Sequence, residues 1–217
     1  MIVDERVSCY IKSLTAYNSD FLEKLGEKAL EAKVPIIKRE TESFLKTFLL
    51  LKKPKRILEV GAAVAYSSLV MAETLEGNVK ISTIENYEKR VLEARKNIKD
   101  SHYSNIIHLI EEDASKVLKE LVEKEEKYDF IFMDAAKGQY INWLEPVIKL
   151  LNKEGVLCSD NVLQGGDIVQ SRYLIERRDR SIHSRLREYL YELTHREELS
   201  TTILSLGDGV ALTVLKK

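Results

Sequence analysis

The chain has 217 residues, of which 44% are apolar, enough for one compact domain with a sizeable core. Its 34 Lys and Arg residues nearly balance its 35 Asp and Glu residues, so a formal net charge of −1 excludes a protein whose whole surface is basic. The uncharged run 60–72 is shorter than the roughly 18–20 residues that cross a bilayer. The mixed charges near the start of the chain argue against a signal peptide, and we expect a cytoplasmic protein.

The first part of the chain is predicted to be helical. Over residues 17–52, apolar side chains such as Phe21, Leu22 and Leu25 recur at helical spacing. Pro35 interrupts this pattern, because proline has no amide to donate and restricts the residue before it. We therefore expect an appendage of two or three helices within residues 1–53.

From Lys55 onward, short β-branched runs alternate with helical patterns. This alternation predicts right-handed βαβ units, and the turn at Asp208-Gly209 predicts an antiparallel hairpin. The fold class is therefore α/β: a seven-stranded mixed sheet, with five parallel strands and a C-terminal antiparallel hairpin, in one domain over residues 1–217 whose α/β core is 54–217. The expected strands are 56–60, 79–84, 106–110, 128–133, 155–159, 199–206 and 210–215, with helices at 65–75, 88–98, 115–123, 140–151 and 168–196.

In an open α/β sheet, ligands bind beyond the carboxyl ends of the strands. Glu59 lies near the end of the first predicted strand, and the following loop has Gly61 but lacks the other glycines of a dinucleotide fingerprint, which disfavours a dehydrogenase. The small residues of this loop have two possible roles: they permit close approach of a ligand, or they form a simple turn without one. After the second strand, Glu85 either accepts hydrogen bonds from ribose hydroxyls or is a solvated acid. After the third, Asp113 either receives an adenine amino group or caps a helix.

Oxygen ligands follow both the fourth and the fifth predicted strands: Asp134 after the fourth, and Asp160 and Asn161 after the fifth. Three hard oxygen donors suit Mg²⁺ or Ca²⁺ better than zinc. A buried carboxylate pair without a metal would repel itself, so we expect either a cation or a shared proton there. The alternative is one acid that caps a helix and one that faces solvent. Lys137 is a candidate for taking a proton or stabilising negative charge, unless it is an ordinary surface lysine.

The predicted helix 168–196 is rich in arginine. An excess of positive charge on one segment indicates either a solvated helix face or a surface that contacts phosphate groups beside the site. The candidate substrate contacts are Arg172, Arg177, Arg178 and Arg180.

The chain resembles the metal-dependent class I O-methyltransferases of the catechol and caffeoyl-CoA type. The resemblance covers nearly its whole length and rests on the motifs Glu59-x-Gly61, Tyr66-Ser67, Ile84-Glu85, Asp113-Ala114, Asp134-Ala135-x-Lys137 and Asp160-Asn161. Within that family, residues 34–37, residues 160–166 and the arginine-rich segment are most similar to the bacterial tRNA 5-hydroxyuridine methyltransferases.

This resemblance implies a Rossmann-like fold, S-adenosylmethionine as the methyl donor and Mg²⁺ as the metal. It implies that Asp134, Asp160 and Asn161 bind Mg²⁺, and that Asp134 and Lys137 are catalytic. Ala62 and Ala65 stand where the family usually has Thr and Gly. The implied cofactor contacts are Ile37, Glu59, Gly61, Ser67, Glu85, Asp113, Ala114 and Asp134.

The implied reaction is methylation of the 5-hydroxyl of 5-hydroxyuridine at the tRNA wobble position, giving 5-methoxyuridine, with the anticodon loop as the partner. A small catechol or a hydroxycinnamoyl thioester is the alternative acceptor, because catechols and 5-hydroxyuracil each offer two vicinal oxygens to one cation. Tyr140 or Trp143 would stack on the base or belong to the core. A non-catalytic nucleotide- or RNA-binding module is disfavoured by the retained metal positions. The resemblance also implies a homodimer, and we expect no membrane partner.

Overall fold

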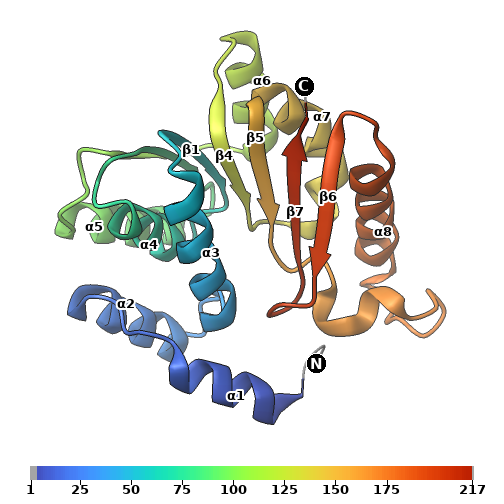
Figure 1. Ribbon diagram of the computed structural model, residues 1–217, viewed down its shortest axis with the longest axis horizontal. Helices are drawn as coiled ribbons and strands as arrows, with labels where there is room; N and C mark the ends of the chain where they lie inside the picture. The colour runs from blue at the N-terminus through green and yellow to red at the C-terminus, as the bar shows by residue number, and fades with distance from the viewer. Residues whose placement is uncertain (1–3, 217) are drawn as a thin grey trace. The chain divides into compact units, whose positions relative to one another are not determined.

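The computed structural model describes residues 4–216 (Figure 1). Within these residues, seven strands form one sheet in the order β3-β2-β1-β4-β5-β7-β6, which confirms the predicted fold class. The chain divides into two compact units, here called the N-terminal unit (Arg6–Val117) and the C-terminal unit (from Leu118 onward, together with Asp4 and Glu5). The prediction of a single domain over 1–217 stays a prediction, and its residues 1–3 and 217 lie outside the described part.

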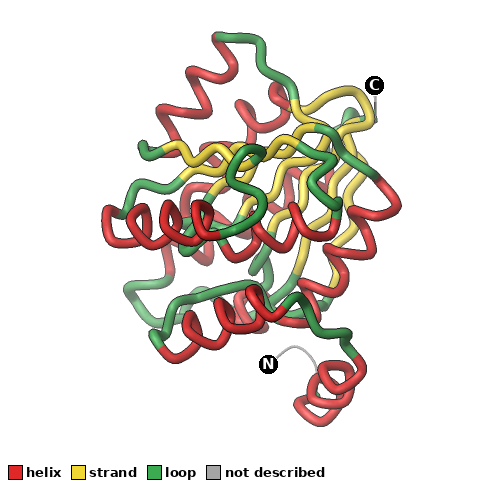
Figure 2. The backbone as a smooth tube through the Cα atoms, turned by 90° about the vertical axis from the view of Figure 1, so that its left-hand side faces the viewer, coloured by secondary structure: helices red, strands yellow, loops and turns green. Residues whose placement is uncertain are grey.

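The N-terminal unit opens with helices, the first of which lies next to the N mark in Figure 2. It continues as alternating strands and helices. Its elements are α1 (Glu5–Leu14), α2 (Asp20–Glu31), α3 (Arg39–Lys52), β1 (Arg56–Val60), α4 (Tyr66–Thr74), β2 (Lys80–Ile84), α5 (Glu88–Asp100), β3 (Ile107–Ile110) and α6 (Ala114–Glu123), in which the boundary between the units falls.

Local signals explain where these helices begin and end. The Ser19 side chain caps α2 by accepting a hydrogen bond from Leu22 N at 3.5 Å. Lys53, which follows α3, has a left-handed φ of 49°, a common way to end a helix, and Pro54 then prevents continuation. Helices α2 and α3 both pack against α4, whose first seven residues are all buried.

The parallel register of β1, β2 and β3 aligns their carboxyl ends. Val60 lies opposite Ile84, and Ile84 lies opposite Ile110. The loops that follow these strands, including Gly61 and Glu85, therefore begin at the same edge of the sheet.

The C-terminal unit combines a parallel strand pair with an antiparallel hairpin. In Figure 1, β7 lies between β5 and β6. Strand β5 pairs parallel with β4 and antiparallel with β7, as predicted. The elements are β4 (Tyr128–Met133), η1 (Lys137–Gln139), α7 (Tyr140–Leu150), β5 (Leu151–Ser159), η2 (Gln164–Val169), α8 (Arg180–His195), β6 (Leu199–Leu204) and β7 (Val210–Leu215).

The predicted helix over 168–196 was wrong in its first half. Residues 170–179 form successive turns, and the helix begins only at Arg180. Between 170 and 179 only Ile175 is buried, whereas α8 buries a stripe that includes Leu186, Tyr189 and Leu193. Helices in proteins depend mainly on packing an apolar face, and the arginine-rich start of this segment has none.

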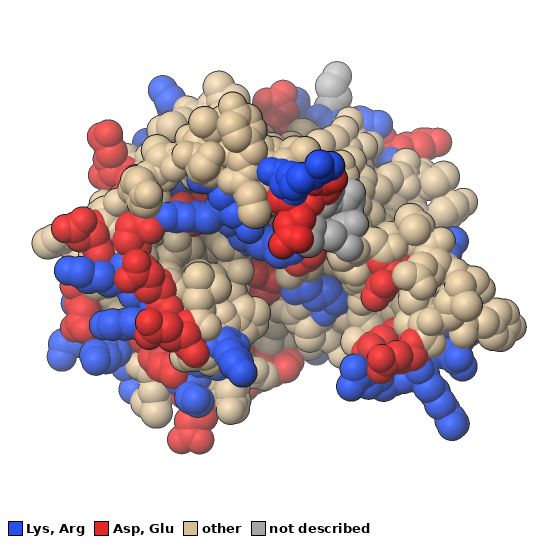
Figure 3. Space-filling view, turned by 90° about the horizontal axis from the view of Figure 1, so that it is seen from below, with Lys and Arg blue, Asp and Glu red and all other residues tan. Residues whose placement is uncertain are grey.

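Charged side chains of both signs are interspersed on the face shown in Figure 3, in keeping with a net charge near zero. Among residues 4–216, no helix is both long and apolar enough to cross a bilayer.

Candidate functional site

The loop between β1 and α4 has an unusual backbone. Gly61 has φ 102°, which favours glycine, but Ala63 and Ala65 also have positive φ values of 46° and 63°. Such conformations cost free energy in residues with a Cβ atom and persist only where the surroundings impose them. The amides of Gly61 and Ala62 both donate to Ile84 O, at 3.1 and 2.9 Å, and so fix the start of the loop to the end of β2.

Glu85 braces this loop from the neighbouring strand end. Its carboxylate accepts hydrogen bonds from the backbone amides of Ala63 at 2.9 Å, Asn86 at 3.0 Å and Tyr87 at 2.9 Å. The half-buried side chain is therefore an ordered acceptor and not a freely solvated acid. An ordered carboxylate at this edge fits a role in binding ribose hydroxyls.

Two further cofactor candidates lie in the interior at the same end of the sheet. Glu59 is fully buried and accepts hydrogen bonds from the hydroxyls of Ser68 and Thr83. Ser67, in the first turn of α4, is also buried. The structure thus places Glu59 as an anchor between β1, β2 and α4.

Asp113 adopts the helix-cap arrangement. Its Oδ1 accepts a hydrogen bond from Ser115 N at 2.9 Å, and its Oδ2 lies 3.4 Å from Asn86 Nδ2. Ala114 is the first residue of α6, and Asp113 is exposed. Asp113 therefore caps α6, and its exposed side chain leaves room for contact with a ligand as well.

Ile37 is separate from these strand ends in sequence and lies between α2 and α3. It is buried and lines a pocket of about 330 Å³ within the N-terminal unit, together with Arg39, Glu42 and Tyr66.

The register of the C-terminal unit brings the two predicted acids to one edge. Met133 at the end of β4 lies opposite Ser159 at the end of β5, so Asp134 and Asp160 follow paired residues. Asp160 is 2% exposed, and its Oδ1 accepts a hydrogen bond from Asn161 N at 2.8 Å. Burial, and then the negative charge of Asp134, raise the pKa of Asp160 to about 7.

Lys137 and Asp134 form an ion pair with 2.7 Å between Nζ and Oδ1. The positive charge of Lys137 also favours the ionised form of Asp160 and so lowers its pKa against the effect of burial. Asn161 is half-buried and has a left-handed φ of 61°. Three predicted residues thus lie near the buried carboxylate of the fourth, Asp160, at the ends of β4 and β5: Asp134, Lys137 and Asn161.

Of the two alternatives for Tyr140 and Trp143, stacking on a base or belonging to the core, the structure supports the core. Trp143 is buried, and Tyr140 is fully buried and not placed to stack on a substrate base. Its hydroxyl donates to Met133 O at 2.9 Å, lies 3.3 Å from Asp160 O, and accepts a hydrogen bond from Ala135 N at 3.2 Å. Tyr140 therefore holds the two strand ends that carry the acids.

These residues suit a divalent cation. Asp134, Asp160 and Asn161 offer hard oxygen donors, and a cation would offset the repulsion that raises the pKa of Asp160. Within residues 4–216, no three His, Cys, Asp or Glu side chains group closely enough to hold a metal. The remaining predicted oxygen donor is Asn161, which follows Asp160 directly.

A buried thiol lies two residues before Asp160. Cys158 on β5 is 1% exposed. Burial, followed by the negative charges of Asp160 and Asp134, raises its pKa well above the ordinary value of a thiol. Cys9 on α1, by contrast, is exposed.

The arginines proposed as tRNA contacts fall into two groups. Arg172 and Arg177 are exposed. Arg178 pairs with Glu176 at 3.0 Å and Asp179 at 3.4 Å. Arg180 donates to the carbonyls of Ile175, at 3.0 Å, and Tyr173, at 3.3 Å, and so stabilises its own segment.

Comparison with known proteins identifies the family. Residues 12–217 match the model of a family described as O-methyltransferase. A catechol O-methyltransferase from Niastella koreensis is 30% identical over 76% of this chain and 76% of that protein. A crystal structure provisionally named a caffeoyl-CoA O-methyltransferase, from Staphylococcus aureus, has a TM-score of 0.89 at 29% identity and covers 97% of this chain and all of that one (100%). The SAH-bound methyltransferase of Podospora anserina has a TM-score of 0.87 at 26% identity, covering 98% and 95% of the two chains. The chain therefore belongs to the O-methyltransferase family.

Proposed function

We propose that this protein transfers a methyl group from S-adenosylmethionine to one hydroxyl of a small aromatic acceptor with two vicinal oxygens, such as a catechol or a hydroxycinnamoyl thioester. The observation that carries the proposal is the placement of two acids, Asp134 and Asp160, after paired strand residues and beside Lys137. Family membership supports the methyl transfer, and the named catechol and caffeoyl-CoA relatives support the acceptor class.

In this proposal, each unit contributes its own set of residues. In the N-terminal unit, Gly61 and Ala62 give close backbone access, Glu85 holds the ribose, and Ile37, Glu59, Ser67, Asp113 and Ala114 complete the cofactor contacts. In the C-terminal unit, Asp134, Asp160 and Asn161 would hold Mg²⁺; Asp134 is also assigned to the cofactor. When bound, a divalent cation supplies Lewis acidity that lowers the pKa of an acceptor hydroxyl.

Lys137 is proposed to act directly on the acceptor. Its ammonium donates to Asp134 at 2.7 Å, which fixes the position of Nζ at the edge where both acids lie. From there the ammonium stabilises the negative charge that develops on the acceptor oxygen. When Nζ is deprotonated, it instead receives the proton of the acceptor hydroxyl. Methyl transfer is an in-line displacement, so correct alignment of donor and acceptor supplies much of the rate acceleration.

The decisive experiment measures methyl transfer by the purified protein with catechol and caffeoyl-CoA, in Mg²⁺ and in EDTA, using mass spectrometry of the product. We expect a monomethylated product that requires the cation. Asp160→Ala should lose rate by roughly a hundredfold, because the cation would lose a ligand. A wild-type protein that binds S-adenosylmethionine but methylates neither acceptor would contradict the proposed acceptor class.

A tRNA acceptor is the second candidate, favoured by the exposed Arg172 and Arg177. The same assay includes tRNA that carries 5-hydroxyuridine, with 5-methoxyuridine as the product to detect. Reversing Arg172 and Arg177 to Glu tests this candidate better than changing Arg180, because Arg180 supports its own backbone. The double reversal would abolish methylation of tRNA and spare catechol; an equal loss on both would contradict a specific tRNA contact.

The homodimer and the cytoplasmic location are proposals that rest on the resemblance and on composition. Sedimentation of the purified protein at several concentrations tests the first.

A further inference from the structure

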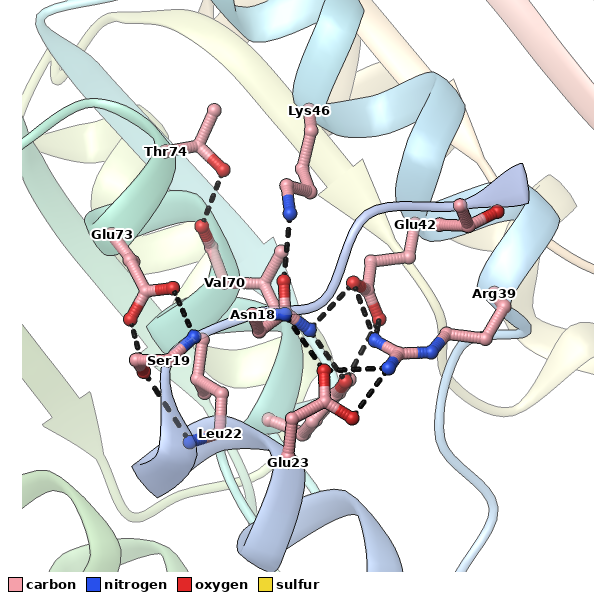
Figure 4. A network of polar contacts seen from close by, with 12 residues as sticks. Asn18, Ser19, Leu22, Glu23, Arg39, Glu42, Lys46, Val70, Glu73 and Thr74 are labelled. Atoms are coloured by element: carbon pink, nitrogen blue, oxygen red, sulfur yellow. Dashed lines mark hydrogen bonds and ion pairs between the residues drawn. The ribbon is translucent and has the colours of Figure 1, made fainter. Parts of the chain in front are cut away.

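A buried carboxylate connects the first helices of the N-terminal unit to α4. Glu42 on α3 is fully buried. Its oxygens accept hydrogen bonds from the Tyr66 hydroxyl at 2.8 Å, Asn18 Nδ2 at 2.7 Å and an Arg39 guanidinium nitrogen at 3.0 Å. Segments far apart in the sequence therefore meet at one side chain (Figure 4).

The contacts extend around Glu42 and balance its charge. Arg39 also pairs with Glu23 on α2 at 2.5 Å, and Lys46 Nζ donates to Asn18 Oδ1 at 2.7 Å. We call this group the Glu42 network: Asn18, Glu23, Arg39, Glu42, Lys46 and Tyr66. Burial, followed by the charge of Glu42, raises the pKa of Tyr66, so its hydroxyl stays protonated and donates.

Stability alone does not account for such a network. Removing charges from water is costly, and well-packed apolar side chains often stabilise a fold as much as a buried ion pair does. What a network of directed hydrogen bonds adds is a fixed position for each group. The Tyr66 ring is further confined by α2, since a Cβ atom on Gly26 would lie 3.2 Å from Tyr66 Cε2.

Tyr66 is the first residue of α4, directly after the strained loop at the end of β1. Other side chains hold the earlier part of that loop: Glu85 binds Ala63 N, and Asn97 donates to Val64 O at 2.9 Å. At Ala65, the N-cap of α4, no side chain makes a capping hydrogen bond. Glu85 and Asn97 thus hold the loop at Ala63 and Val64. The contact between Tyr66 and Glu42 restrains the end of the loop that follows, where it joins α4.

We propose that Glu42 is a positioning residue for cofactor binding: through the Tyr66 hydroxyl it holds residues 61–67 in the conformation that receives S-adenosylmethionine. This inference rests on the proposed function, because it assigns the loop to that cofactor. It assigns no contact between Glu42 and the reacting groups.

The test compares two hydrogen-bonded contacts of α4, one at its first residue and one in its last turn. Tyr66→Phe removes only the hydroxyl that reaches Glu42. Glu73→Ala removes a tether at the last turn of α4, where Glu73 accepts a hydrogen bond from Ser19 N at 3.1 Å (Figure 4). Calorimetry with S-adenosylhomocysteine measures binding without turnover. We expect about 3- to 10-fold weaker binding in Tyr66→Phe, the value of one hydrogen bond, and less than about twofold change in Glu73→Ala.

Kinetics and a second variant separate positioning from a general loss of structure. Tyr66→Phe should raise KM for S-adenosylmethionine and leave kcat at saturating cofactor close to that of the wild type. Glu42→Gln should also weaken binding, and adding Tyr66→Phe to it should cost less than Tyr66→Phe alone, because the two residues act through one contact. If Tyr66→Phe does not fold, the affinity of Glu42→Gln for S-adenosylhomocysteine tests the proposal in its place.

Unchanged affinity in Tyr66→Phe, or an equal loss in Glu73→Ala, would overturn the positioning role while the proposed function stands. A wild-type protein that binds no S-adenosylhomocysteine would overturn the proposed function itself, and the inference with it.

Discussion

Asp160 shows how the position of a single residue changes its chemistry. The side chain is 2% exposed and faces the charge of Asp134. Its pKa rises from an ordinary 3.8 to about 7, so between these values the folded protein keeps a proton that the unfolded chain has released. The stability contributed by this proton is full at low pH and is lost as the pH rises through about 7.

Asp160→Asn should therefore make the metal-free protein more stable at pH 8, because it removes a buried charge that repels Asp134. Thermal unfolding at pH 6 and pH 8 measures the effect, and the gain should be smaller at pH 6. Mg²⁺ should raise Tm of the wild type more at pH 8 than at pH 6 and should not stabilise the variant, since the cation needs the ionised carboxylate. Asp167→Asn, an exposed change, is the matched control. A variant that still gains stability from Mg²⁺ would show that Asp160 is not a ligand.

Among individual residues, those at strand ends could be predicted and those in helix contacts could not. Asp134 and Asp160 follow recognisable strands, and parallel pairing brings their positions together. Glu42 lies in a charged helical stretch, which in sequence is indistinguishable from a solvated face. Its burial depends on the packing of α3 against α4, a contact between segments that are separated in the sequence.

At the scale of elements, the tip of the β6–β7 hairpin supports the segment after Asp160. Val162 N donates to Gly209 O and Leu163 N donates to Asp208 O, both at 3.0 Å. Gly209 has φ 94°, and a Cβ atom there would lie 2.7 Å from Leu163 N. The hairpin and the segment after Asp160 therefore fit together only without a side chain at position 209.

Gly209→Ala should lower the free energy of unfolding by about 2–4 kcal/mol and weaken the stabilisation by Mg²⁺. Gly166→Ala is the matched control, because Gly166 also has a positive φ, 108°, but nothing lies within 4 Å of its added Cβ atom. It should cost about 1–2 kcal/mol from backbone strain alone. Chemical denaturation measures the free energy of unfolding of both variants. Equal decreases in the two variants would mean that the overlap of the added Cβ atom with Leu163 costs no free energy.

The element boundaries show which sequence signals are reliable. The β-branched runs at 56–60, 128–133 and 210–215 were predicted to the residue. Strand β5 begins earlier than predicted, at Leu151. Its pairing with β4 is irregular between Tyr128 and Phe130, and residues 152–154 are polar and not buried, so their sequence does not indicate a strand. The turns at 170–179 were not predicted, because this charged segment buries only Ile175 and its sequence does not distinguish turns from a solvated helix.

At the scale of the whole molecule, charge separates the two acceptor candidates. The net charge is −1, and two of the four candidate arginines are engaged by their own segment. Between 50 and 200 mM KCl, we expect KM for catechol to change by less than about twofold. A nucleic acid held through 6–10 phosphate contacts would lose about 10³- to 10⁵-fold in affinity over the same range. Steady-state assays with catechol and with tRNA at both salt concentrations test this. A KM for tRNA that hardly changes with salt would contradict binding through phosphate contacts.

The contrast between the two thiols has a practical consequence. Cys158 keeps its proton inside the sheet, whereas Cys9 is open to reagents on α1. A maleimide dye added to the native protein should therefore attach at position 9 alone, without mutagenesis. Such a label would report by fluorescence anisotropy whether α1 changes its motion when the cofactor binds.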